Sequence, residues 1–201
     1  MSLRTEARQY GVAIRAMLIF TVVLGVGYTA VITGIGQLLL PAQANGSLAT
    51  LNGKPTGSSL IGQGFTDKDG KALPEWFQSR PSAAGDGYDG AASSGSNLGP
   101  ENADLVKSIG ERQATIAESD GVVVEQIPAD AVTASASGLD PHISPAYAEI
   151  QVNRVAQARN LSPQEVQSLV TENTSPRDLG YLGEPTVNVL RLNLALAKLK
   201  G

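Results

Sequence analysis

One apolar run dominates the pattern of hydrophobic and polar positions along the chain. No charged side chain occurs between Arg15 and Lys54, and residues 16–40 form an almost continuous apolar segment. As an α-helix, this segment would be about 37 Å long, which exceeds the roughly 30 Å hydrocarbon core of a bilayer. The pattern therefore predicts one N-terminal transmembrane helix over residues 16–40. It leaves residues 1–15 as a short flank and residues 41–201 as a separate domain.

A cleaved signal peptide is the alternative for this run. Residues 42–44 read Ala-Gln-Ala, which resembles a cleavage site. However, the apolar core of a signal peptide is usually about 7–15 residues long, so the length of this run favours an uncleaved anchor.

The charges that flank the run predict its orientation. Before it lie Arg4, Arg8 and Arg15 against Glu6, and short basic flanks stay in the cytoplasm. We therefore expect a cytoplasmic N-terminus and a main domain on the outer, periplasmic side of the membrane.

Within the run, small and polar residues recur every fourth position and would form one narrow stripe on a helix. The stripe consists of Thr21, Gly25, Thr29, Thr33 and Gln37. Small stripes let helices approach closely in lipid, so this one favours packing against partner helices over a chance distribution.

Beyond the run, the pattern alternates between helical and strand-like segments and predicts an α+β domain. Residues 41–57 are typical of a loop with one short strand, and the composition of residues 85–99 is typical of a flexible linker. Pro100 suits the first turn of a helix over residues 101–118, which Asp120-Gly121 would end. The β-branched residues 122–127 and the segment 131–138 are predicted strands.

The C-terminal part contains two clear helix starts. Ser144 followed by Pro145 predicts a helix to about Arg159. Ser162 with Glu165 forms a capping box that predicts a second helix to about residue 173. From Val187 onward the leucines alternate as in a strand but also fit a helix, so we expect a strand near Val187 with a possible helical end.

The composition excludes several classes of protein. There are 15 Lys and Arg against 19 Asp and Glu, and this net charge of −4 argues against nucleic-acid binding. The chain has no cysteine and one histidine, which rules out thiolate metal sites and multi-histidine sites.

Motifs for catalysis are largely missing. The phosphate-binding pattern G-x-x-x-x-G-K-[ST] fails at Gly53-Lys54, because Pro55 follows. Ser135, Asp140 and His142 lie close together in sequence, but no G-x-S-x-G elbow surrounds Ser135. A structural role for all three is therefore favoured over a catalytic triad. Arg80, which could bind an anion, is likewise interpreted as structural.

Four blocks nevertheless carry a specific family signal. They read GSSLIGQGF (57–65), WFQSRPSAAGDGYDGAASSGSNLGP (76–100), VTASASGLDPHISPAYAEIQVNRVAQARNLS (132–162) and LGYLGEPTVNVLRLNLAL (179–196). With these blocks and its basic-flanked span, the chain resembles the C subunit of the Kdp potassium-transporting P-type ATPase, the KdpC family. The resemblance also implies that residues 85–99 are an ordered, tightly turned element and not a linker.

The resemblance implies an accessory role in a high-affinity, ATP-driven potassium uptake pump of the bacterial inner membrane. The expected partners are a channel-like potassium-translocating subunit, a P-type ATP-hydrolysing subunit, a small membrane subunit and the lipid bilayer. The chain would assemble and stabilise the first two and could cap the potassium entrance. The alternative is a catalytic chaperone that raises the affinity of the hydrolysing subunit for ATP.

The same resemblance implies no catalysis by this chain, which lacks the D-K-T-G signature of P-type pumps. No cofactor is expected to bind it directly, because the complex handles ATP and potassium. The motif residues expected to have structural or interface roles are Arg80, Ser82, Tyr88, Asp89, Ser94, Asn97, Ser135, Asp140, His142, Asn153 and Arg154.

Overall fold

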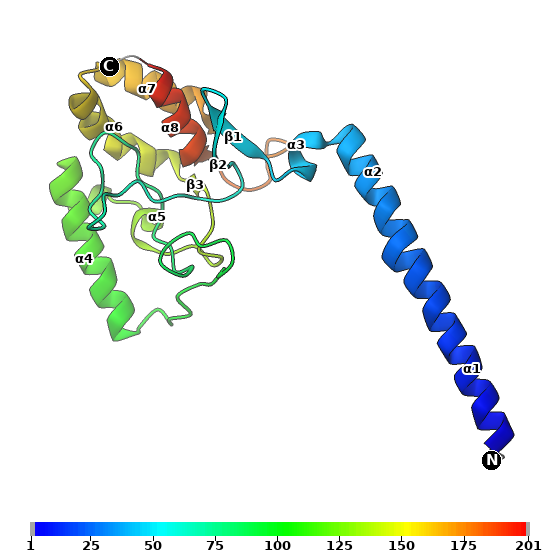
Figure 1. Ribbon diagram of the computed structural model, residues 1–201. Helices are drawn as coiled ribbons and strands as arrows, with labels where there is room; N and C mark the ends of the chain where they lie inside the picture. The colour runs from blue at the N-terminus through cyan, green and yellow to red at the C-terminus, as the bar shows by residue number, and fades with distance from the viewer. Residues whose placement is uncertain (1–2, 200–201) are drawn as a thin grey trace. The chain divides into compact units, whose positions relative to one another are not determined.

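The computed structural model describes residues 3–199 and divides the chain into two compact units, which meet between Ser47 and Leu48 (Figure 1). The first unit is helical. Its elements are α1 (Leu3–Phe20), the π-helix η1 (Thr21–Tyr28), α2 (Thr29–Leu39) and the short α3 (Pro41–Ala44).

The predicted span is a helix, and it is longer than predicted. α1, η1 and α2 run on from one another, and Glu6–Leu39 is a 34-residue stretch that is long and apolar enough to cross a membrane. In its middle the helix widens to π geometry, where the Thr29 hydroxyl donates to the Leu24 carbonyl at 3.4 Å. Short π segments of this kind occur often at functional positions of helices.

The second unit combines short strands with five α-helices among the described residues, which confirms the α+β prediction. Its elements are β1 (Leu48–Leu51), β2 (Lys54–Ser58), α4 (Ala103–Asp120), the 3₁₀ helix η2 (Val124–Gln126), α5 (Ala129–Val132), β3 (His142–Ile143), α6 (Pro145–Arg159), α7 (Pro163–Glu172), β4 (Thr174–Ser175), β5 (Thr186–Asn188) and α8 (Val189–Lys198).

Two antiparallel sheets organise this unit. β1 and β2 form a hairpin whose turn residues Asn52 and Gly53 both have positive φ, the geometry for which Asn-Gly is the preferred sequence. The other sheet has the order β3-β5-β4, with Val187 of β5 opposite Ile143 and Thr174. Its centre continues into the core formed by α6, α7 and α8, where the fully buried residues include Val155, Val166, Val187, Leu192 and Leu196.

The helix signals of the sequence are mostly confirmed. The Ser144 hydroxyl caps α6 by accepting from Tyr147 N at 3.0 Å, and Ser162 forms its capping box with Glu165. α4 ends at Asp120, and the next residue, Gly121, caps it in the left-handed conformation. The prediction for Pro100 is wrong: α4 begins at Ala103, because the Asn102 side chain accepts the first free N–H groups of this helix.

Two strand predictions are wrong, each because local hydrogen bonds satisfy the backbone. In residues 122–127, a 3₁₀ turn forms in which the Gln126 side chain accepts from Val123 N. In residues 131–138, helix α5 and a turn at Gly138 replace the strand. The strand at Val187 is confirmed, but it ends at Asn188, whose side chain caps α8. The alternating leucines of 190–196 are therefore helical.

Candidate functional site around the glycine-rich segment

Residues 77–78 lie outside any strand or helix, and their backbone is held by side chains. The buried Asn193 amide accepts from Phe77 N at 3.0 Å and donates to Phe77 O at 2.9 Å. The buried Gln151 amide pairs with Gln78 in the same two-way manner, at 2.6 and 3.3 Å. Each amide thus supplies the donor and acceptor that a strand residue would offer, and the two fix the start of the glycine-rich block.

Arg154 extends this clamp. Its guanidinium pairs with Asp120 at 2.5 Å and donates to Pro74 O, Trp76 O and the Gln151 side chain. The two charged side chains are only 9% and 4% exposed. Burial raises the pKa of Asp120, and Arg154 opposes that shift. The predicted site residue Arg154 is therefore a structural hub that joins α4 and α6 to residues 74–78.

The glycine-rich segment is ordered, as the resemblance implied, and the linker interpretation is wrong. The Ser82 hydroxyl donates to Gly138 O at 2.6 Å and accepts from Ala84 N and Tyr88 N. Ser94 N in turn donates to Ser137 O at 3.0 Å. Residues 136–138 thus contact the chain just before the segment, at Ser82, and again within it, at Ser94 and Gly95.

Close backbone approach explains why this segment needs glycine. At Gly138 φ is +69°, and a Cβ there would lie 2.6 Å from Ser94 O and 2.7 Å from Ala84 N. A Cβ at Gly95 would lie 2.8 Å from Ala136 O. Both gaps are too small for any side chain.

Tyr88 locks the first turn of the segment. It has positive φ, and its hydroxyl donates to the Arg80 carbonyl. Its ring lies where a side chain at Gly62 would be, since a Cβ at Gly62 would lie 2.4 Å from Tyr88 Cε1. Burial raises the pKa of Tyr88 to about 12, so its hydroxyl keeps its proton and the hydrogen bond at neutral pH.

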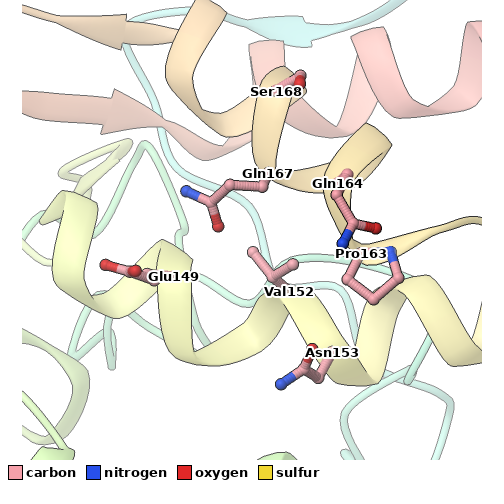
Figure 2. Close-up of a pocket in the computed structure, with 7 residues that line it drawn as sticks. All are labelled: Glu149, Val152, Asn153, Pro163, Gln164, Gln167 and Ser168. Carbon is pink, nitrogen blue, oxygen red and sulfur yellow. The ribbon is translucent and has the colours of Figure 1, made fainter.

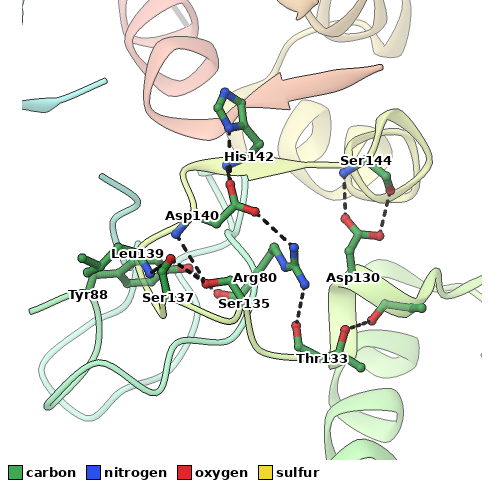
Figure 3. A network of polar contacts seen from close by, with 11 residues as sticks. Arg80, Tyr88, Asp130, Thr133, Ser135, Ser137, Leu139, Asp140, His142 and Ser144 are labelled. Atoms are coloured by element: carbon green, nitrogen blue, oxygen red, sulfur yellow. Dashed lines mark hydrogen bonds and ion pairs between the residues drawn. The ribbon is translucent and has the colours of Figure 1, made fainter. Parts of the chain in front are cut away.

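Asp140 is the centre of a second polar network, shown in Figure 3. Its carboxylate pairs with Arg80 at 3.1 Å and accepts from His142 N at 2.9 Å, with His142 Nδ1 3.3 Å away. These contacts, led by the hydrogen bond with the His142 side chain, lower the pKa of Asp140. Arg80 thus bonds Asp140 and the Thr133 carbonyl within the domain.

The clustered Ser135, Asp140 and His142 are close in space but are not arranged for nucleophilic attack. The Ser135 hydroxyl lies 3.4 Å from the Ser137 hydroxyl and 3.5 Å from Asp140 N. The His142 ring points away from Ser135, beyond the Asp140 carboxylate (Figure 3). A triad needs the imidazole on the serine hydroxyl, so this geometry supports the structural role.

The remaining motif residues of the domain lie at its surface. Asp89, Ser94 and Asn97 are exposed along the glycine-rich segment, and Asn97 has positive φ. Asn153 is exposed on α6 at a hollow of about 470 Å³ between α6 and α7 (Figure 2). The other residues that line this hollow are mostly polar: Glu149, Val152, Pro163, Gln164, Gln167 and Ser168. The structure does not bring Asn153 together with the Asp140 network.

Within the span, Thr21 and Gly25 share a face, because a Cβ at Gly25 would lie 4.0 Å from Thr21 Cγ2. Thr29 and Thr33 follow in α2 with exposed side chains. Gln37 has a contact within the chain: its side-chain oxygen accepts a hydrogen bond from the Asn45 amide, which also donates to Pro41 O. It therefore stabilises the bend into α3.

Sequence reasoning missed three structural residues: Gln151, Asn193 and Asp120. A signal was available for the first two. Gln151 falls among Tyr147, Ala148, Val152 and Val155 on the buried face of α6, and Asn193 falls in the same way among the buried residues of α8. An amide on an apolar helical stripe indicates a specific buried partner.

Together, these features define an α+β domain held by side-chain clamps and joined to one helix that is fit to span a membrane. Residues 10–198 match the family described as KdpC, the c chain of the K⁺-transporting ATPase. The chain belongs to this family. It is therefore an accessory subunit of a potassium-transporting ATPase.

Individual relatives agree over nearly their full length. The potassium-transporting ATPase KdpC subunit of Kineococcus radiotolerans is 50% identical over 98% of this chain and 96% of its own length. That of Gemmatimonas aurantiaca is 55% identical over 92% of both chains. That of Mycobacterium tuberculosis is 49% identical over 96% of this chain and 99% of its own.

Proposed function

We propose that this chain assembles and stabilises a potassium-uptake pump, by holding the channel-like and the ATP-hydrolysing subunits together from a membrane-anchored outer domain. The observation that carries the proposal is the full-length family match, which includes both the apolar helix and the clamped domain. The helix would anchor the chain in the bacterial inner membrane as a single span. The arginines before it favour a cytoplasmic N-terminus and a periplasmic domain.

The geometry of the glycine-rich segment supports a role in binding a partner. Ser82, Tyr88 and Gly138 fix its backbone as far as Gly95, so the exposed Asp89 and Ser94 are presented in one conformation, and the exposed Asn97 follows two residues later. A surface that is already ordered loses little entropy on binding. We propose that this edge contacts the channel-like subunit, where the domain could cap the potassium entrance.

A matched pair of variants tests this surface. Asn97 and Asn160 are both exposed asparagines with φ near +54°, at +53° and +55°. Glycine at either position keeps the backbone conformation and removes only the side chain. We expect Asn97→Gly to lower recovery of the partner subunits with a tagged chain, and Asn160→Gly to leave recovery unchanged. Equal recovery would place the interface elsewhere.

The rival function is direct help with ATP binding, as a catalytic chaperone. It requires the domain on the cytoplasmic side, where ATP is. Protease added outside spheroplasts should digest residues 41–201 and leave a short protected stub. A domain that is protected until the membrane is opened would refute the periplasmic orientation and favour the rival.

A further inference from the structure

The loop between β4 and β5, residues 176–185, exposes three large apolar side chains. Leu179, Tyr181 and Leu182 are 81%, 69% and 49% exposed. We call residues 176–185 the apolar loop. None of the three side chains belongs to the core, so the fold of the domain does not explain them.

The apolar loop has a defined conformation. Asp178 and Leu182 exchange two backbone hydrogen bonds of 2.9 Å, and Arg177 pairs with Glu184 across its base. Leu179 has a φ of +53°, which is unfavourable for a residue with a bulky side chain. The loop therefore holds its apolar side chains outward in a fixed arrangement, at a cost in backbone strain.

The strand that follows the apolar loop, β5, ends beside the point where the chain enters the domain. Asn188, at the end of β5, donates to Ser59 O at 2.8 Å. Ser59 directly follows β2, in which Ser58 lies opposite Leu48, the first residue of the domain. Leu48 and Leu60 at this place are also exposed apolar residues.

Covalent connection limits how far this point can lie from the membrane. Nine peptide units separate Leu48 from Leu39, the last residue of the apolar helix. At no more than about 3.6 Å per residue, Leu48 lies within roughly 32 Å of the end of that helix. The apolar loop thus belongs to a domain that only a short connection, residues 40–47, joins to the apolar helix.

We propose that the apolar loop inserts into the headgroup region of the lipid bilayer, with Leu179, Tyr181 and Leu182 as its anchors. This inference rests on the proposed membrane anchoring of the chain. Tyrosine is enriched at membrane interfaces because its ring is apolar and its hydroxyl is polar. Three side chains are also a small surface compared with the roughly 800 Å² per partner of a standard protein interface.

The charges of the loop make the contact independent of anionic lipid. Arg177, Asp178 and Glu184 give it a net charge of −1, so attraction to negative headgroups does not contribute. We expect the same insertion into zwitterionic phosphatidylcholine at low and at high salt.

The chain has no cysteine, so a single nitroxide label can be placed at will. The labelled variants are Tyr181→Cys in the loop, Val23→Cys in the span as a lipid reference and Glu118→Cys on the exposed face of α4 as a water reference. The full chain is studied in phosphatidylcholine nanodiscs. Collisions of the label with oxygen, which concentrates in lipid, are compared with collisions with a water-soluble nickel complex.

We expect the ratio of oxygen to nickel collisions at Tyr181 to exceed that at Glu118 several-fold and to approach that at Val23. A ratio equal to that at Glu118 would overturn the proposal. So would a loss of both kinds of collision in the co-purified complex, because that result would show a protein partner covering the loop. Leu179→Cys and Leu182→Cys repeat the measurement if the first label disturbs the fold.

The outcome is separable from that of the proposed function. A nickel-accessible label at Val23 would refute the anchor, and with it this inference. Failure of the chain to co-purify with partner subunits would refute the assembly role, while the result at Tyr181 would still stand.

Discussion

At Phe77 and Gln78, the backbone belongs to no strand or helix, and its hydrogen bonds go to the side chains of Asn193 and Gln151. A buried amide that serves a backbone N–H and C=O at once cannot be replaced by an apolar residue of similar size, since both backbone groups would be left unpaired. Such residues are sensitive points of the fold, although they take no part in any chemistry.

We predict that Asn193→Leu lowers the free energy of unfolding by roughly 3 kcal/mol, because two buried backbone groups lose their partners. Urea unfolding of the detergent-solubilised chain measures this. Asn153→Leu on the exposed face of α6 is the control and should change stability by no more than about 0.5 kcal/mol. Similar losses for the two variants would contradict the clamp.

Asp140 predicts a pH dependence of stability. Its pKa in the folded chain is lowered from the ordinary value of 3.8 by contacts with His142 and Arg80. A lowered pKa stabilises the folded state above the unfolded pKa, and this contribution is lost as the pH falls through the folded pKa. The stability advantage of the natural chain over Asp140→Asn should therefore be constant above about pH 5 and shrink below about pH 4. If the stability advantage over Asp140→Asn instead grows as the pH falls, the pKa of Asp140 is raised in the folded chain and not lowered.

At the scale of elements, the same residue type has opposite effects in different places. Gly138→Ala should destabilise the chain by about 2 kcal/mol or more, because φ is positive and neighbouring backbone atoms block a Cβ. Gly110→Ala, in α4 with open space around it, should stabilise the chain by roughly 0.5–1 kcal/mol. Thermal unfolding measures the change in stability of each variant. Changes in the same direction would contradict the different roles assigned to the two glycines.

Elements with strong local signals could be predicted from the sequence, and those that depend on distant contacts could not. The caps at Ser144 and Ser162 depend on neighbouring residues and gave the starts of α6 and α7. The strand predicted over 122–127 lacks any neighbouring strand, which β-propensity cannot reveal. The helix α8 could not be predicted with certainty from the sequence, because its leucines fit both the strand period and the helix period. Only the Asn188 cap and the packing in the core decide between the two.

The same limit applies to the candidate site. The family motifs marked Arg80, Ser82, Tyr88 and Asp140, and the structure joins these residues in neighbouring networks. Gly62, which lies against Tyr88, and Gly138, which accepts from Ser82, are distant in sequence from those two residues, so no local pattern could assign the contacts. The resemblance alone indicated that residues 85–99 are ordered, because composition does not distinguish a tightly turned segment from a flexible one.

The apolar helix carries the next prediction. A Cβ at Gly25 would lie 4.0 Å from Thr21 Cγ2, an ordinary contact distance, so we expect the helix itself to tolerate Gly25→Leu. A partner helix packed on the stripe would not, because small residues are what allow close approach in lipid. We expect Gly25→Leu to lower recovery of the assembled complex severalfold in co-purification, and Val23→Leu to have little effect. Equal recovery would assign the stripe to chance.

At the scale of the whole molecule, residues 41–201 carry 12 Lys and Arg against 18 Asp and Glu, a net charge of −6. An acidic domain near the outer mouth of a pump could concentrate potassium by its field. The Debye length is about 10 Å at 0.1 M salt, so the field acts only at close range. It would attract sodium equally and could not provide selectivity.

We therefore predict that the domain acts through contact and not through its field. Asp67, Asp69 and Glu118 are exposed acids that can be neutralised together as Asp67→Asn, Asp69→Asn and Glu118→Gln. The Asp67 side chain accepts from Asp69 N and Lys71 N at 3.0 and 2.8 Å, and asparagine keeps this acceptor, so the turn survives. At physiological salt, the triple variant should change the apparent potassium affinity of the pump less than twofold. Deletion of residues 41–201 should abolish stable complex activity, because the contacts are gone. If the neutralised chain loses potassium affinity as severely as the deletion, the field of the domain and not its surface is what the pump uses.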